Sequence, residues 1–144
     1  MKEIFSEIEI NASDEKVWGI LTDFNAFPEW NPFIKEIEGK LEVGAKFKAF
    51  LQLPGSKGMT FRPKCLKVEH SKELWWIGHM IIPGLFDGEH RFIIEPIDEN
   101  KVRFIQKELF RGILTPIIMK SITDKTQQGF EMMNRALMER AERS

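Results

Sequence analysis

A chain of 144 residues, 42% hydrophobic and 30% charged, is long enough for one globular domain with a sizeable core. Its formal net charge of −1 removes the simplest argument for nucleic-acid binding, which usually needs a basic excess on one face. The single cysteine, Cys65, excludes an intramolecular disulfide and therefore a disulfide-stapled secreted scaffold. We expect one domain over residues 1–144, in the cytoplasm, with no targeting segment, no integral membrane segment and no nucleic-acid partner.

The first part of the chain predicts a strand, a helix and a short helical turn. Residues 2–11 alternate isoleucine with glutamate, which is the period of a strand. Ser13 suits a helix N-cap, and apolar residues then recur at helical spacing over 17–24. Pro28 and Pro32 limit the next segment to a short helical turn or loop.

From residue 34 the hydrophobic period changes to two, which indicates strands. Short turn-forming sequences separate the segments, so successive strands are predicted to pair antiparallel. The expected strands cover residues 34–40, 45–53, 59–69, 73–82, 88–96 and 101–110.

A long helix is expected over about residues 116–142, with Pro116 in its first turn. It is the only element long enough to cover one face of a seven-stranded antiparallel sheet. We therefore predict an α+β fold in which a curved seven-stranded sheet wraps around the C-terminal helix, with one or two short helices after the first strand. A sheet and a single helix leave space between them, so an internal cavity is expected, and 12 Phe and four Trp against no Tyr suit an apolar lining.

Three segments carry a family resemblance. Residues 27–34, FPEWNPFI, contain a Trp-Asn-Pro signature, and residues 83–96 and 104–114 add two further segments. Together they resemble the START-like (SRPBCC) superfamily, which includes polyketide cyclase/dehydrase-like proteins, lipid-transfer domains and plant pathogenesis-related proteins, and within it the small, uncharacterised bacterial and archaeal type. The resemblance covers nearly the whole chain and implies the helix-grip fold with a deep pocket. It selects no single function, because the superfamily hosts binding, transport, cyclisation, hydrolysis and chaperone-cofactor roles.

One pair of ionisable residues is predicted to face the interior. Apolar neighbours place His90 on the inner face of strand 88–96 and Glu108 on the inner face of strand 101–110. The intervening turn brings the two residues opposite each other or one pair away. Burial of both is costly unless they meet. They are either a satisfied structural pair or a polar anchor or general acid/base at the closed end of a pocket.

The other candidate ligand contacts are mostly apolar. Gly78 either leaves room for a ligand or marks a bulge, and Trp30 is either a core anchor or part of the cavity rim. The loop from Pro83 to Asp87 carries large apolar residues that suit contact with a ligand, a membrane or a protein partner. Two methionines, Met119 and Met132, would add an adaptable lining. The predicted ligand-binding residues are Trp30, Phe47, Trp76, Gly78, Met80, His90, Phe92, Phe104, Glu108, Phe130 and Met133.

Motifs for common cofactor and nucleophile chemistries are missing from the sequence. The three histidines lack metal-ligand spacing, residues 55–58 are typical of a hairpin turn rather than a P-loop, and no GxSxG is present. Cys65 is expected to be a buried strand residue. We therefore predict no metal and no cofactor, and the candidate catalytic residues are His90 and Glu108.

The first functional hypothesis is binding, or transport, of one small hydrophobic or amphipathic ligand such as a lipid, polyketide or ring compound. The alternative is a cofactor-free cyclase, dehydratase or hydrolase that uses His90 and Glu108 as acid and base. A second alternative is a protein-partner or stress-related binding module. Binding is favoured because enzyme pockets usually show more convergent polar groups than this interior does.

Overall fold

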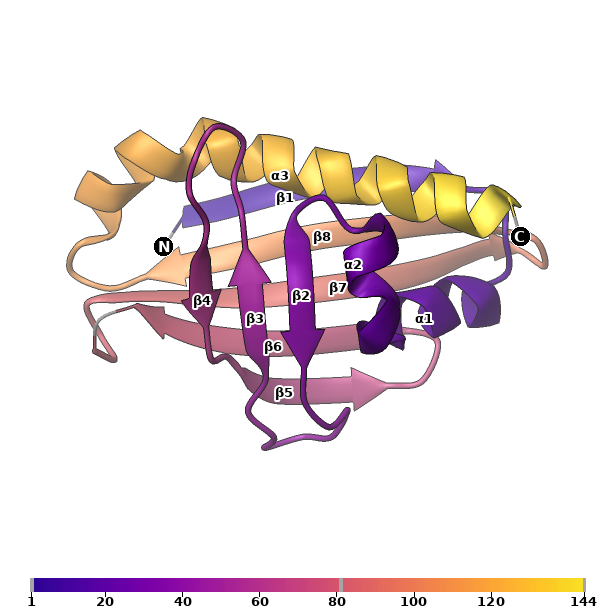
Figure 1. The fold of residues 1–144 in the computed structure, drawn as a ribbon, viewed down its shortest axis with the longest axis horizontal. Coiled ribbons are helices and arrows are strands. Elements are labelled where there is room, and N and C mark those ends of the chain that lie inside the picture. Colours follow the sequence, from indigo (N-terminus) through magenta and orange to yellow (C-terminus); the bar gives the residue numbers. More distant parts are fainter. Residues whose placement is uncertain (1, 81, 144) are drawn as a thin grey trace.

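Two antiparallel sheets and one long helix form the structure, a computed structural model that describes residues 2–80 and 82–143 (Figure 1). The large sheet has the strand order β1-β8-β7-β6-β5, and the small sheet has the order β2-β3-β4. The strands of the large sheet are β1 (Lys2–Ile10), β5 (Lys64–Glu69), β6 (Glu73–Met80), β7 (Phe86–Asp98) and β8 (Lys101–Arg111). Those of the small sheet are β2 (Ile34–Glu38), β3 (Lys48–Leu51) and β4 (Met59–Phe61).

Three short helices connect β1 to β2. They are α1 (Asp14–Thr22), the 3₁₀ helix η1 (Phe24–Ala26) and α2 (Phe27–Trp30). Ser13 caps α1 as predicted, because its hydroxyl oxygen accepts the Lys16 N–H at 3.2 Å. The Oδ1 atom of Asn31 accepts the N–H groups of Phe33 and Ile34, so the asparagine of the Trp-Asn-Pro segment turns the chain from α2 into β2.

The predicted architecture is confirmed, with one correction: in the described residues, eight strands in two sheets replace seven strands in one. The expected strand 59–69 is interrupted at Pro63, which has no N–H to give to a sheet ladder. The two sheets remain linked there. The Phe47 N–H donates to the Pro63 carbonyl oxygen, and the Cys65 N–H donates to the Ala45 carbonyl oxygen, both at 2.8 Å.

The long helix α3 (Thr115–Arg143) lies along the inner face of the large sheet (Figure 1). Gly129 permits close approach of the chain, because a Cβ there would lie 2.7 Å from the Phe33 ring. Met132 is exposed, so its predicted part in the lining is wrong. The fully buried apolar positions of α3 are Phe130, Met133, Leu137 and Ala141. Within the described residues, no helix combines the length and the apolar character needed to cross a membrane.

Candidate functional site

His90 and Glu108 meet on the inner face of the large sheet. The β7–β8 register pairs them directly, as predicted, and the Nδ1 atom of His90 lies 3.4 Å from the Oε1 atom of Glu108. The His90 ring is buried among aromatic rings. Its centroid lies 4.3 Å from that of Phe92, 4.8 Å from that of Phe130 and 5.5 Å from that of Trp76. An imidazole in such a setting is costly unless both ring nitrogens have partners.

Gln106 links His90 to α3. The Nε2 atom of Gln106 donates to the carbonyl oxygen of Phe130 at 3.3 Å and to Oδ1 of Asn134 at 2.8 Å. The Oε1 atom of Gln106 then lies 2.9 Å from Nε2 of His90. Asn134 in turn donates to the Ser6 hydroxyl at 2.9 Å, so a buried polar chain joins β7, β8, α3 and β1. Sequence reasoning missed this chain, although one signal for it exists: Gln106 is, beside Glu108, a second polar residue among the apolar residues of this strand face.

The same network determines which nitrogen of His90 carries a hydrogen. The backbone carbonyl of Phe130 can only accept, so the amide nitrogen of Gln106 must face it and the amide oxygen must face His90. The Nε2 atom of His90 is therefore the donor, and Nδ1 is the nitrogen that faces Glu108. An imidazole nitrogen beside a carboxylate is an arrangement that suits a general acid/base.

Two glycines lie opposite each other beside this pair. Gly78 of β6 pairs with Gly88 of β7 with no shift in register, so Gly78 does not mark a bulge. A Cβ at Gly88 would overlap the carboxylate of Glu108, whereas a Cβ at Gly78 would meet no neighbouring atom within 4 Å. We call the space above these two residues the glycine recess. The Glu108 carboxylate fills its Gly88 half, and its Gly78 half is open.

Glu108 borders this open space. Its side chain is 17% exposed, although Gln106 and Phe110, which precede and follow it on the same face of β8, are buried. Among residues 2–80 and 82–143, no group donates a hydrogen bond to the Oε2 atom of Glu108. A carboxylate oxygen at the edge of an unfilled apolar space can accept the hydroxyl or N–H of a bound molecule.

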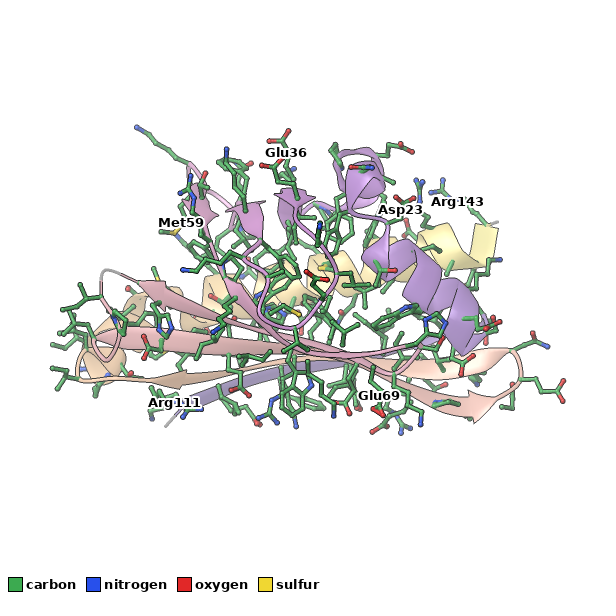
Figure 2. The ribbon with its side chains drawn as sticks, turned by 90° about the horizontal axis from the view of Figure 1, so that it is seen from below. Asp23, Glu36, Met59, Glu69, Arg111 and Arg143 are labelled. Atoms are coloured by element: carbon green, nitrogen blue, oxygen red, sulfur yellow. The ribbon has the colours of Figure 1, made fainter. Side chains whose placement is uncertain are left out.

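The other predicted ligand contacts fall into two groups. Met80 is half-buried on β6, at the open end with Gly78. Trp30 is half-buried at the end of α2, 5.2 Å from the ring of Phe27, and its Nε1 atom has no hydrogen-bond partner in the described part of the chain. The remaining predicted contacts are buried in the core: Phe47, Trp76, Phe92, Phe104, Phe130 and Met133. Figure 2 shows side chains filling the space between the two sheets.

Two surface hollows lie away from the recess. One, of about 370 Å³, is lined by residues of η1, α2 and the small sheet, among them Phe24, Ile37 and Phe50. The other, of about 510 Å³, borders Glu38 and Lys48. Neither includes His90, Glu108 or a glycine of the recess. The recess has the stronger claim to function because it lies beside His90 and Glu108, which neither of these two hollows includes.

Asp87 anchors the loop 82–85 next to the recess. Its carboxylate accepts the Gly84 N–H at 3.1 Å and lies 2.8 Å from Nδ1 of His79. Burial raises the pKa of Asp87. The hydrogen bonds from His79 and Gly84, together with the charges of His79 and Arg111, outweigh burial and hold that pKa below its ordinary value of 3.8.

Cys65 is buried, as predicted. Burial raises the pKa of its thiol, with a smaller opposing effect of a hydrogen bond to the Lys67 backbone, so Cys65 is not poised as a nucleophile. In the described part of the chain, no three His, Cys, Asp or Glu side chains are grouped so as to hold a metal ion.

The long helix α3 packs on the inner face of the large sheet, where His90 and Glu108 meet. Comparisons with known proteins agree with this architecture. Residues 1–142 match the model of the family described as polyketide cyclase / dehydrase and lipid transport. The chain belongs to this family. The START-like, polyketide cyclase-like resemblance of the sequence is thereby confirmed. A search of curated proteins finds no significant match.

Several solved structures share the fold of this polyketide cyclase / dehydrase and lipid transport family member. The Zhui aromatase/cyclase from Streptomyces sp. R1128 superposes with a TM-score of 0.79 at 12% identity, covering 99% of this chain and 94% of that one. A START superfamily protein from Mycobacterium smegmatis gives 0.75 at 20% identity, with 98% and 97% covered. Norcoclaurine synthase from Thalictrum flavum gives 0.72 at 15% identity, with 99% and 94% covered. At these identities the likeness shows the fold alone.

Proposed function

We propose that this protein binds one small, largely apolar molecule that carries a hydroxyl or enol group. The apolar body occupies the open half of the glycine recess, and the O–H donates to the Oε2 atom of Glu108. The observation that carries the proposal is the position of this oxygen, which lies over Gly88, opposite the open space at Gly78, and receives no hydrogen bond from the described residues. The family description, which names polyketides and lipids, supports a ligand of this chemical class.

The walls of the recess favour a flat or ring-shaped ligand. Phe86 and Phe110 stack at the open end with centroids 5.3 Å apart, and the Phe110 ring lies 3.3 Å from where a Gly88 Cβ would stand. Aromatic walls with one charged acceptor bind a hydroxylated ring through apolar burial and one charge-assisted hydrogen bond. His90 holds the other oxygen of Glu108, so the acceptor is oriented before the ligand arrives.

The test compares two probes that differ by one hydroxyl, 2-naphthol and naphthalene, with binding followed by fluorescence. The native chain should prefer 2-naphthol by about tenfold, and Glu108→Leu should remove the preference. Gly78→Phe should abolish binding by filling the recess. Thr60→Phe places the same side chain in the surface hollow of about 370 Å³ and should leave binding unchanged. Blocked binding in Thr60→Phe with normal binding in Gly78→Phe would refute the proposal.

A second candidate function, proton transfer in a cofactor-free cyclase or dehydratase, rests on the contact of 3.4 Å between the Nδ1 atom of His90 and the Oε1 atom of Glu108. The Glu108 carboxylate would take a proton from the carbon beside a ligand carbonyl, and the electron pair of the broken C–H bond would form the enolate. The ketone 2-tetralone tests this step, because each enolisation in D₂O exchanges one hydrogen for deuterium. Catalysis predicts exchange above the buffer rate in the native chain that is lost in Glu108→Gln. Exchange at the buffer rate in both proteins would leave binding as the function.

A further inference from the structure

Thr126 is a polar residue on the buried face of α3. It is 6% exposed, and it precedes the fully buried Met133 by seven residues, which is close to two helical turns. Both side chains therefore project from the same side of the helix, toward the large sheet. Lys125, one residue earlier, is exposed. A threonine in this position is either structural or a contact for a molecule that lies between the helix and the sheet.

The direction of α3 relative to the strands determines the level at which Thr126 lies. The Nε2 atom of Gln127 donates to the Phe5 carbonyl oxygen at 2.9 Å. Further along both elements, the Oε2 atom of Glu142 accepts the Asn11 N–H at 2.8 Å. Helix α3 therefore runs in the same direction as β1 (Figure 1). Strand β7 shares this direction, because β1 and β7 both pair antiparallel with β8.

This common direction places Thr126 at the glycine recess. Phe130 marks the level of His90, because their ring centroids lie 4.8 Å apart. Thr126 is one turn before Phe130, about 6 Å along the helix axis. Gly88 is two residues before His90, about 7 Å along β7. Thr126 therefore lies at the level of Gly88, on the helix side of the recess, and Glu108 lies on the sheet side.

The hydroxyl of Thr126 differs from those of two other helical threonines. Thr22 of α1 and Thr123 of α3 each donate the hydroxyl to the carbonyl oxygen four residues earlier. The Thr126 hydroxyl forms no hydrogen bond with residues 2–80 or 82–143. A buried hydroxyl without a partner lowers the stability of a fold. Its proton is available to an acceptor that enters the recess.

We propose that Thr126 is a second polar contact of the ligand, and that the ligand carries a carbonyl group in addition to its hydroxyl or enol. This inference rests on the proposed function, because it concerns the same ligand in the same recess. The Thr126 O–H donates to the carbonyl oxygen while Glu108 accepts the ligand hydroxyl, so the ligand is held between helix and sheet. A carbonyl suits Thr126 because it only accepts hydrogen bonds, and it brings no negative charge that the Glu108 carboxylate would repel. Hydroxy ketones and enolised diketones combine both groups.

Paired probes test this contact, with binding followed by fluorescence. Each pair consists of a 2-naphthol that carries an acetyl group at carbon 4, 6 or 7 and its counterpart with an isopropenyl group, which has the same shape without the acceptor. The native chain should bind at least one acetyl compound about fivefold or more tightly than its counterpart. Thr126→Val should reduce this preference to less than about twofold, and Thr126→Ser, which keeps the hydroxyl, should retain it.

The matched control is Thr123→Val, which removes an exposed hydroxyl that bonds within α3 and should leave the acetyl preference unchanged. The melting temperature of Thr126→Val should equal or exceed that of the native chain, because the change removes a buried polar group that lacks a partner. A clear fall in melting temperature would assign the hydroxyl to the fold and overturn the inference.

The inference is also overturned if the native chain shows no acetyl preference, or if the preference survives in Thr126→Val. Binding of 2-naphthol and naphthalene, measured on the same proteins, separates this failure from that of the proposed function. A native chain that prefers 2-naphthol without any acetyl preference refutes the role of Thr126 alone. A native chain that binds none of the naphthols refutes both.

Discussion

The two ends of the inner sheet face differ, although the same strands build both. At the end we call closed, Phe92 of β7 and Phe104 of β8 are buried against Phe130 and Met133 of α3. At the open end, the corresponding stretches of β6 and β7 carry Gly78 and Gly88, and β8 carries Glu108. Strand β6 pairs with β7 without a register shift along its whole length.

Side-chain size and charge, rather than backbone geometry, therefore decide where the interior is filled. At the closed end, large apolar residues interdigitate and exclude water, which stabilises the fold. At the open end, two missing side chains leave room that one carboxylate only half occupies. A space that the chain leaves unfilled beside a charged group contributes little to stability and is the place to look for function.

Truncation of a core aromatic is the largest effect that the comparison predicts. Phe130→Ala removes a fully buried ring from the closed end and should lower the free energy of unfolding by about 3–5 kcal/mol. Met80→Ala at the open end should cost about 1 kcal/mol or less, because the half-buried side chain leaves no closed cavity. Urea unfolding of both variants measures the difference. Equal costs would show that the open end is ordinary core.

Gln106 lies at the boundary between the two ends. Gln106→Leu leaves the Nε2 atom of His90, the Oδ1 atom of Asn134 and the Phe130 carbonyl without their shared partner. The free energy of unfolding should therefore fall by about 3 kcal/mol or more. Nitrogen NMR of the His90 ring should show hydrogen on Nε2 in the native chain and a mixture of tautomers in the variant. An unchanged tautomer would mean that the amide does not orient the ring.

The two glycines of the recess form a matched pair. Gly88→Ala must displace the Glu108 carboxylate and should lower the free energy of unfolding by about 1–3 kcal/mol. Gly78→Ala meets no neighbouring atom and should change stability by about 0.5 kcal/mol or less. Thermal unfolding distinguishes them, and the reverse order would place the open half of the recess over Gly88 instead.

The smallest effect concerns Asp87 and the acid side of the pH range. Because the folded-state pKa of Asp87 lies below 3.8, its contacts stabilise the fold fully at pH values above 3.8. This stabilisation is lost as the pH falls through the folded-state pKa. The melting temperature of Asp87→Asn should therefore lie below that of the native chain near pH 6, and the gap should shrink below about pH 4. A gap that widens on acidification would contradict the lowered pKa.

Much of the fold was predictable because each element carries a local signal. Hydrophobic period and turn chemistry predicted the order of elements, and the short turn after β7 set the register that brings His90 opposite Glu108. The interruption at Pro63 also has a local cause, since proline cannot donate to a ladder.

The details of the candidate site were less predictable because they depend on distant residues. The bond from Asn134 to Ser6 spans 128 positions, and that from Gln106 to Asn134 spans 28, so no local pattern indicates either. The need for glycine at position 88 arises from the Glu108 side chain on the next strand. Most of the predicted lining residues are buried in the structure, and their contact with a ligand stays a prediction. The sequence signal of an inward-facing aromatic is the same whether it packs against protein or lines a space.

An amide NMR titration with 2-naphthol tests most directly the claim that the open end is a ligand site. The account predicts that the largest saturable shifts fall on Gly78, Gly88 and Glu108, and that Gly78→Phe removes them. Shifts confined to Phe24, Ile37 and Phe50 would place binding in the surface hollow and contradict the account.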